Sequence, residues 1–300
     1  MKGLALSEGF YEAFGRPMLE ERFPQLLPHV SIGLTGSGSE CLGYDDELSE
    51  DHDFTPDFCI FLPGEDVVSR RDAFLLERAY SGLPKSYEGV SRAVLSPVGG
   101  NRRGVLRLSE FLLEKLGAPD GSLSTDQWLR IPSQYLLEVT CGKLFYDGSG
   151  AFTRIREALK AYPEDIRKKR LAGHLLMMAQ AGSYNLFRCL RHGEPAAAQL
   201  CLNEFVEEAL EVFFLLENRY LPYYKWRFRA LRETSFAGQE EALSDLLNGG
   251  AFRYREETLT DKVRQVLQAV TEEDPGKRAY EINDSIPDSE IRNLHILYCV

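Results

Sequence analysis

Two short apolar segments near the start of the chain flank a polar stretch, and this arrangement most constrains the fold. Residues 30–34 (Val-Ser-Ile-Gly-Leu) and 58–62 (Phe-Cys-Ile-Phe-Leu) are bounded by turn residues. Apolar runs of this length between turns are typical of buried strands. A glycine- and serine-rich turn over residues 36–39 and an acidic stretch lie between them. The chain is therefore expected to turn sharply after the first strand, and acidic residues are expected to lie directly before the second strand.

The acidic stretch contains Asp51 and Asp53, two positions apart, just before the second apolar segment. In extended backbone, residues i and i+2 project from the same face, so these carboxylates can point together. Close carboxylates repel each other unless a cation lies between them, and oxygen ligands suit Mg²⁺ or Mn²⁺. The turn from Gly36 to Ser39 offers backbone N–H groups and two hydroxyls to phosphate oxygens. The pattern predicts a metal and polyphosphate site, and hence nucleotide chemistry.

A plainer interpretation treats residues 36–39 as an ordinary turn and residues 43–53 as a solvated acidic loop. The apolar segment that follows Asp53 and Phe54 argues against it. Carboxylates at the entrance to a buried strand are less easily explained by solvation alone, so we favour the functional interpretation.

Gly36 and Ser37, followed after residues 38–50 by Asp51-His52-Asp53, resemble the signature of the nucleotidyltransferase superfamily that includes DNA polymerase beta. The longer string of residues 36–47, continuing into residues 51–54, resembles the family known as domain of unknown function 4037, which is considered a relative of these enzymes. The layout of the whole chain is similar to small-molecule adenylyltransferases such as kanamycin nucleotidyltransferase, in which a helical domain follows a catalytic domain.

The resemblance implies roles for individual residues. Ser37, in the turn that begins at Gly36, matches the position that binds the β and γ phosphates of the nucleotide, and Ser39 is a weaker candidate. Asp51 and Asp53 match the two metal ligands. The implied reaction is in-line attack on the α-phosphate with pyrophosphate leaving. We expect Mg²⁺-dependent transfer of AMP from ATP to a hydroxyl of an unidentified small molecule or macromolecule.

The sequence departs from the superfamily at a third carboxylate, which usually comes from a later strand. The matching segment, residues 104–108, contains no acid; Glu110 follows it, and Glu138 lies on an expected helix. Three alternatives stay open: two carboxylates suffice, another acid serves as the base, or catalysis has been lost. The last would leave a silent nucleotide-binding or regulatory module. A further alternative is that the protein is a nucleotidyltransferase that forms one partner of a toxin–antitoxin-like pair. This alternative is suggested by fold analogy alone.

A second informative stretch, residues 220–227, combines aromatic and cationic side chains around a proline. Tyr224 and Trp226 suit stacking on a base or sugar, and Lys225 suits contact with phosphate. Alternatively, these aromatics pack at a domain interface while Lys225 reaches solvent. The resemblance favours substrate contact, because the helical second domains of such enzymes cover the active site.

Hydrophobic periodicity predicts an α/β (α+β) chain with a mixed sheet and helices in residues 1–149 and an all-α helical bundle in residues 150–300. The resemblance implies that the first of these domains is nucleotidyltransferase-like. The hinge is expected at residues 148–150. Residues 69–81 are predicted to form a helix with Phe74, Leu75, Ala79 and Tyr80 on its apolar side. Strands are expected at residues 30–34, 53–62, 104–108 and 143–146. Further helices are expected at residues 110–116, 131–140, 165–192, 204–217, 240–247 and 260–272, and Asn203 is expected to be the N-cap of the helix over residues 204–217.

The net charge of −11 argues against a sequence-independent nucleic-acid binder, which needs clustered cations. Arg102 and Arg103 are expected in a solvated loop. The six cysteines show no CxxC spacing, so buried free thiols in a reducing cytoplasm are expected. No apolar segment reaches the length of a membrane span and the first 14 residues lack a signal-peptide core, so we expect a cytoplasmic protein without a membrane partner.

Overall fold

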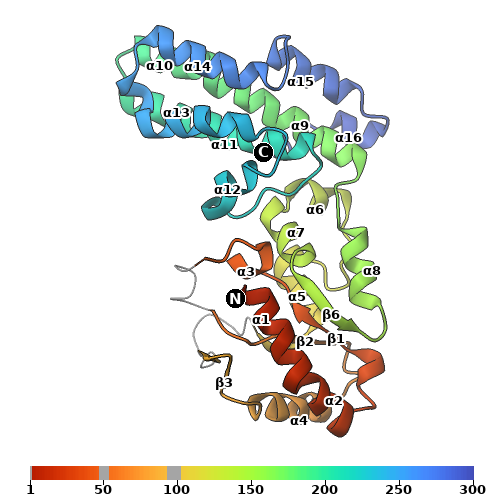
Figure 1. Ribbon diagram of the computed structural model, residues 1–300. Helices are drawn as coiled ribbons and strands as arrows, with labels where there is room; N and C mark the ends of the chain where they lie inside the picture. Colours follow the sequence, from red (N-terminus) through yellow and green to blue (C-terminus); the bar gives the residue numbers. More distant parts are fainter. Residues whose placement is uncertain (1, 47–53, 93–102) are drawn as a thin grey trace. The chain divides into compact units, whose positions relative to one another are not determined.

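The computed structural model describes residues 2–46, 54–92 and 103–300, and it divides into two compact units (Figure 1). Unit 1 comprises Met1–Leu123 and Tyr135–Lys160, and unit 2 comprises Ser124–Gln134 and Ala161–Val300. Unit 1 contains a mixed four-stranded sheet with helices, whereas the described secondary structure of unit 2 is helical. The predicted α+β class is confirmed.

The sheet of unit 1 has the strand order β5-β2-β1-β6. β1 is antiparallel to both β2 and β6, and β2 is parallel to β5. The four expected strands are present, but β2 begins at Cys59 rather than at residue 53, and residues 54–58 lead into it without strand structure. Pro56 in this lead has no N–H to contribute to a ladder. The bounds are β1 (Ser31–Leu34), β2 (Cys59–Leu62), β5 (Gly104–Arg107) and β6 (Lys143–Asp147).

Strand register brings four segments to one end of this sheet. Gly33 near the end of β1 lies opposite Cys59, the first residue of β2. Leu34 lies opposite Lys143 at the start of β6, and Gly104 at the start of β5 lies beside Cys59. The end of β1 and the beginnings of β2, β5 and β6 therefore lie together. We call this edge the site end of the sheet.

Both faces of the sheet are covered. Successive side chains of β2 point to opposite faces, and each set packs against different helices. Ile60 and Leu62 belong to a buried cluster with α1 (Gly3–Phe10), η1 (Tyr11–Gly15), α2 (Arg16–Arg22) and α4 (Arg70–Ser81). The first three of these helices lie across the sheet in Figure 1. Phe61 packs instead against Phe111 of α5 (Leu108–Leu116) and Phe152 of α8 (Ala151–Ala158), with ring centroids 5.2 and 4.9 Å away. Two covered faces explain why β2 is a continuous apolar run.

Helix α4 forms where expected, with Ser69 as its N-cap: the Asp72 N–H donates to Ser69 Oγ at 3.1 Å. Its buried side differs from the prediction, because Leu76 joins Ala79 and Tyr80 in the core. The prediction was wrong for Phe74, which is 58% exposed, and for Leu75, which is 40% exposed. Residues 76, 79 and 80 form the i, i+3, i+4 stripe that faces the sheet, and residues 74 and 75 lie beside it. A hairpin of β3 (Ser86–Tyr87) and β4 (Val90–Ser91) follows α4.

In unit 2, α9 packs along α11 and α15, and α11 packs against α13 (Figure 1). The expected helix 165–192 is confirmed as α9, the π turn η4 and α10. Asn203 is wrong as an N-cap, because α11 begins at Pro195. Proline suits the first helical turn, where its missing N–H has no partner to lose. The expected helix 260–272 begins earlier, at Glu256. The bounds are α6 (Thr125–Arg130), α9 (Glu164–Ala179), η4 (Gln180–Asn185), α10 (Leu186–Arg191), α11 (Pro195–Leu216), α12 (Arg227–Leu231), α13 (Glu240–Arg253), α14 (Glu256–Gln268), α15 (Pro275–Asp284) and α16 (Ser289–Asn293).

The division into units differs from the expected boundary between residues 149 and 150, because α8 belongs to unit 1. Phe152 is fully buried against Phe61, and Arg156 donates to the carbonyls of Thr140 and Cys141 at 2.6 and 2.9 Å. These contacts hold α8 to the sheet domain. Of the helices in the described ranges, none combines the length and apolar character of a membrane span.

Candidate functional site

The glycine- and serine-rich turn follows β1 at the site end of the sheet. Gly36 and Gly38 adopt φ values of +109° and +146°, which side chains other than glycine rarely tolerate. At Gly38 a Cβ would also lie 2.5 Å from Oε1 of Glu40. Ser39 begins the short helix α3 (Ser39–Leu42), and Ser37 and Ser39 are both partly exposed. Glycine therefore allows a compact turn that leaves two hydroxyls accessible.

An ion pair ties this turn to the beginning of β5. Arg103 Nη2 contacts Oε1 of Glu40, and each side chain is only 13% exposed. The expectation of a solvated loop was wrong for Arg103, because its side chain is paired with Glu40 and largely shielded from solvent. Arg102 falls outside the described residues. A nearly buried cation needs such a partner, since removing charge from water is costly. The pair fixes α3 against the lead into β5.

The other side of the turn is braced by α7 (Ser133–Thr140) and by α5. The Thr35 hydroxyl lies 2.9 Å from the carbonyl oxygens of both Glu138 and Cys141. The Cys141 thiol donates to the Gly36 carbonyl at 3.5 Å, and a Cβ at Gly36 would lie 3.9 Å from the Phe111 ring. The turn is therefore held by residues far from it in sequence.

The structure clarifies the question of a third carboxylate. Glu110, the acid that follows β5 in the sequence, is exposed on α5. The end of β5 itself presents Arg107, which donates to the Pro63 carbonyl at 2.6 Å. Glu138 is 14% exposed and lies 2.9 Å from Nζ of Lys115. Across the ranges that are described, no three histidine, cysteine or acidic side chains are grouped as a metal site. Glu138 is thus close to the turn but already neutralised by a lysine.

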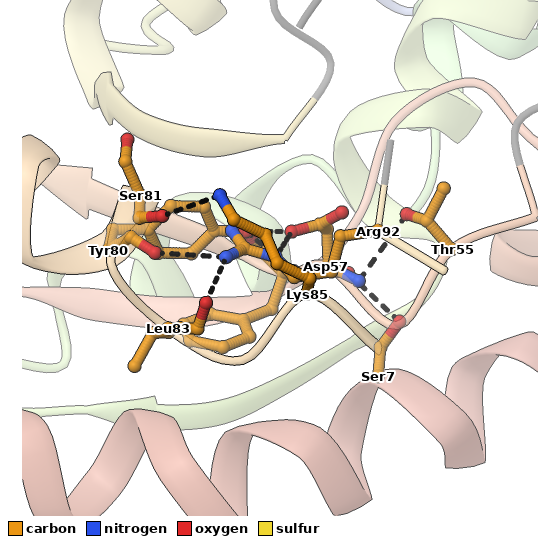
Figure 2. Close-up of polar contacts among 9 residues, drawn as sticks. Ser7, Thr55, Asp57, Tyr80, Ser81, Leu83, Lys85 and Arg92 are labelled. Atoms are coloured by element: carbon orange, nitrogen blue, oxygen red, sulfur yellow. Dashed lines mark hydrogen bonds and ion pairs between the residues drawn. The ribbon is translucent and has the colours of Figure 1, made fainter. Parts of the chain in front are cut away.

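A buried polar network holds the lead into β2 (Figure 2). Nε of Arg92 lies 2.6 Å from Oδ1 of Asp57, and the Tyr80 hydroxyl lies 3.0 Å from the same oxygen. That hydroxyl also lies 2.8 Å from the Phe58 carbonyl and accepts the Phe58 N–H at 3.1 Å. The Ser7 hydroxyl donates to the Asp57 carbonyl at 3.0 Å. Residues from α1, α4 and the segment after β4 therefore converge on Asp57.

The electrostatics of this network favour a fixed position for Asp57. The side chains of Asp57 and Arg92 are 5% and 10% exposed, so each needs the other charge. Burial, together with the nearby Asp57 charge, raises the pKa of Tyr80 well above its usual value. The sequence interpretation missed this network. The available signal was an aspartate directly before the apolar run of β2, but its partners are distant in sequence.

The predicted site residues divide into three groups. Gly36, Ser37 and Ser39 lie at the site end of the sheet. Asp51 and Asp53 lie outside the described residues. The described residues 54–58 that follow Asp53 reach the same end of the sheet as the turn, because β1 and β2 are antiparallel.

The third group, Tyr224, Lys225 and Trp226, forms the 3₁₀ turn η5 (Tyr224–Trp226) in unit 2. Tyr224 is 65% exposed, and its ring centroid lies 4.3 Å from that of Tyr223. Lys225 is exposed, with Nζ 5.1 Å from the centre of the Trp226 ring. Tyr220 is buried instead against Tyr162, at 4.8 Å. The stretch thus combines a buried anchor with an accessible aromatic and cationic cluster.

Comparison with known proteins gives two findings. Residues 128–227 match the family described as Domain of unknown function (DUF4037), which confirms the resemblance to this family over that part of the chain. A crystal structure of a nucleotidyltransferase-like protein from Exiguobacterium sibiricum 255-15 is similar, with 12% identity, coverage of 92% of this chain and 81% of that chain, and a TM-score of 0.39. No protein with a curated description matches. The matched residues 128–227 include Glu138 and η5 but neither the turn nor the acidic stretch.

Proposed function

We propose that this protein is a nucleotidyltransferase that moves AMP from ATP to a hydroxyl of an acceptor molecule. In this proposal the polyphosphate binds to the turn from Gly36 to Ser39. Ser37 is the principal hydroxyl ligand, and Ser39 assists it. Asp51 and Asp53 hold Mg²⁺ or Mn²⁺ beside the turn.

The observation that carries the proposal is the strand register at the site end of the sheet. Gly33 pairs with Cys59, so the turn after β1 and the lead into β2 emerge side by side. Asp53 immediately precedes that lead, whose position is held by the buried network around Asp57. A phosphate-binding turn and a pair of carboxylates are required close together for metal-assisted phosphoryl chemistry.

The donor set suits a hard divalent cation. Aspartate oxygens are the ligands that Mg²⁺ prefers, and it commonly uses one or two carboxylates together with substrate phosphates. The nearby described carboxylates of Glu40, Asp57 and Glu138 are each paired with a cation. The proposal therefore assigns the metal to Asp51 and Asp53, where it would neutralise charge on the α-phosphate and on the leaving pyrophosphate.

The exposed cluster at η5 is proposed as a substrate-binding surface of unit 2. The rings of Tyr224 and Trp226 suit stacking against a base or an acceptor ring, and the Lys225 ammonium suits a phosphate. The exposure of Tyr224 and Lys225 supports this use, because both side chains are accessible to a ligand.

The central experiment incubates purified protein with labelled ATP, MgCl₂ and a metabolite extract, and follows pyrophosphate release and nucleotide addition by mass spectrometry. We expect turnover that requires the divalent cation. Asp51→Asn and Asp53→Asn should each lower the rate by roughly 10²–10³-fold, the effect typical of removing an essential electrostatic group. Asp66→Asn is the matched control, since this exposed aspartate follows the opposite end of β2 and should leave the rate unchanged.

Other outcomes identify the alternatives. Tight ATP binding without turnover on any acceptor would indicate a silent nucleotide-binding or regulatory module. Label on a co-purified protein or tRNA, and on no small molecule, would favour a toxin–antitoxin-like modifying enzyme. Turnover that survives both aspartate substitutions would refute the metal assignment.

A further inference from the structure

Two cysteine thiols from distant parts of the chain meet beside the glycine- and serine-rich turn. Cys41 belongs to α3, directly after the turn, and Cys141 follows the end of α7. Each thiol is the largest single influence on the pKa of the other, raising that of Cys41 and lowering that of Cys141. The backbone joins the same two segments, because the Gly142 N–H donates to the Cys41 carbonyl at 2.9 Å. Cys41 is buried, whereas Cys141 is partly exposed.

We propose that Cys41 and Cys141 are an oxidisable pair that forms a reversible disulfide across the base of the turn. A disulfide requires backbone segments about 4.4–6.8 Å apart between Cα atoms and side chains that point toward each other. The backbone hydrogen bond from Gly142 to Cys41 brings the two segments together, and thiols on these adjoining segments are compatible with both conditions. The bond would covalently connect α3 to the end of α7.

The surroundings favour Cys141 as the thiol that reacts first. It is the more exposed of the two, and Nη2 of Arg156 donates to its carbonyl at 2.9 Å, which brings a fixed positive charge close to the sulfur. The neighbouring Cys41 thiol and the Arg156 charge lower the pKa of the Cys141 thiol despite its burial. A thiolate is the reactive form of cysteine, so these contacts favour attack from Cys141.

The oxidant is a hydroperoxide, with hydrogen peroxide as the simplest case. The Cys141 thiolate attacks one peroxide oxygen, the O–O bond breaks, and water leaves after proton transfer, which gives a sulfenic acid at Cys141. The Cys41 sulfur then attacks the Cys141 sulfur, the S–O bond breaks, and a second water leaves with the thiol proton. Two thiols and one peroxide thus yield one disulfide and two waters.

Oxidation would also change the turn itself. The Cys141 thiol donates to the Gly36 carbonyl at 3.5 Å, and a disulfide sulfur has no proton to donate. The carbonyl would lose this partner, and Cys41, two residues beyond Ser39, would be fixed against Cys141. Disulfide formation is independent of the proposed function; only an effect on nucleotide binding rests on it.

The test maps disulfides in the full-length protein by mass spectrometry after treatment with hydrogen peroxide, with and without later reduction by dithiothreitol. We expect a linked pair of peptides that contain Cys41 and Cys141, with a mass two hydrogens lower than the separate peptides. The link should disappear after reduction and should not form in Cys141→Ser. This measurement on the natural chain does not depend on how well a variant folds.

A second cysteine pair provides the matched control. Cys189 and Cys201 both belong to unit 2, where burial and the neighbouring Cys189 thiol raise the pKa of Cys201. The double variant Cys189→Ser, Cys201→Ser should keep the link between residues 41 and 141. Peroxide treatment that leaves Cys41 fully alkylatable, or that links either cysteine to a different partner instead, would overturn the proposal. If the protein reduced with dithiothreitol shows no ATP turnover, that result would count against the proposed function and not against the disulfide.

Discussion

At the scale of single residues, charge at the site end of the sheet is held in ion pairs that are buried or nearly buried. Asp57 with Arg92, Glu40 with Arg103, and Glu138 with Lys115 each join segments that are far apart in sequence. Removing one member of such a pair is more damaging than the net strength of the pair suggests, because the other charge stays buried without compensation. These residues position the turn and the lead into β2.

Tyr80→Phe tests the network around Asp57. The substitution leaves the Phe58 N–H and the Asp57 carboxylate without the hydroxyl that they contact at 3.1 and 3.0 Å. An unsatisfied buried polar group costs about 1–3 kcal/mol, so the free energy of unfolding in urea should fall by that amount. Tyr280→Phe is the control: this tyrosine is 53% exposed, and its replacement should change stability by less than about 0.5 kcal/mol.

The same variant has a predictable pH dependence. Because burial raises the pKa of Tyr80 above the ordinary value of 10.0, the unfolded chain loses this proton at a lower pH than the folded protein. The stabilisation from Tyr80 is therefore fully present below pH 10.0 and is lost as the pH rises above it. Urea unfolding at increasing alkaline pH should show a steeper loss of stability in the natural protein than in Tyr80→Phe. Equal slopes would contradict a buried, protonated Tyr80.

At the scale of elements, the pairing of β1 with β6 depends on a glycine. The register shifts between Ile32 and Gly33, which marks an irregularity in the ladder. A Cβ at Gly33 would lie 2.3 Å from the Lys143 carbonyl oxygen and 2.8 Å from the Leu144 Cα. These are backbone atoms, so they cannot move aside without disturbing the sheet. The close approach leaves room only for glycine at this position, next to the end of β1 and the turn that follows it.

Gly33→Ala should destabilise the protein by about 1–3 kcal/mol through overpacking against β6. Thermal and urea unfolding would measure the change, and ATP turnover should fall as well if the turn is displaced. Gly238→Ala is the control, since a Cβ at Gly238 would meet no atom within 4 Å. A stable, fully active Gly33→Ala would mean that β6 does not approach β1 as closely as described.

At the scale of the whole molecule, each unit has its own aromatic core. Phe58 in unit 1 lies 5.1 Å from the Tyr80 ring and 5.4 Å from the Tyr11 ring, and it is fully buried. Phe213 in unit 2 is fully buried and stacks on Phe236 at 4.5 Å. Because cooperative unfolding involves residues that pack in one contiguous core, each unit is expected to unfold independently of the other.

Phe58→Ala and Phe213→Ala test this independence. Each should cost about 3–5 kcal/mol, because a large buried ring is lost and a cavity remains. We expect calorimetry to show that each variant lowers the transition of its own unit and leaves the other largely unchanged. A single transition that both variants shift equally would show that the two units unfold together.

Local sequence patterns were sufficient to locate the strands, α4 and the glycine- and serine-rich turn. These features depend on local properties: short apolar runs, proline and glycine at the ends, and φ angles that glycine tolerates. The match to DUF4037 supports the family resemblance, whereas the roles of Asp51 and Asp53 stay predictions.

Which segments share the site end of the sheet depends on long-range packing and not on local sequence. Strand order and register place the turn beside the lead into β2, and they pair Glu40 with Arg103 and Asp57 with Arg92. Side-chain packing against the sheet also holds α8 in unit 1, and the face of α4 that packs there leaves Phe74 exposed. Each of these outcomes depends on residues that meet across long stretches of chain. Local periodicity carries no information about such partners, because they are chosen by packing and by the need to compensate buried charge.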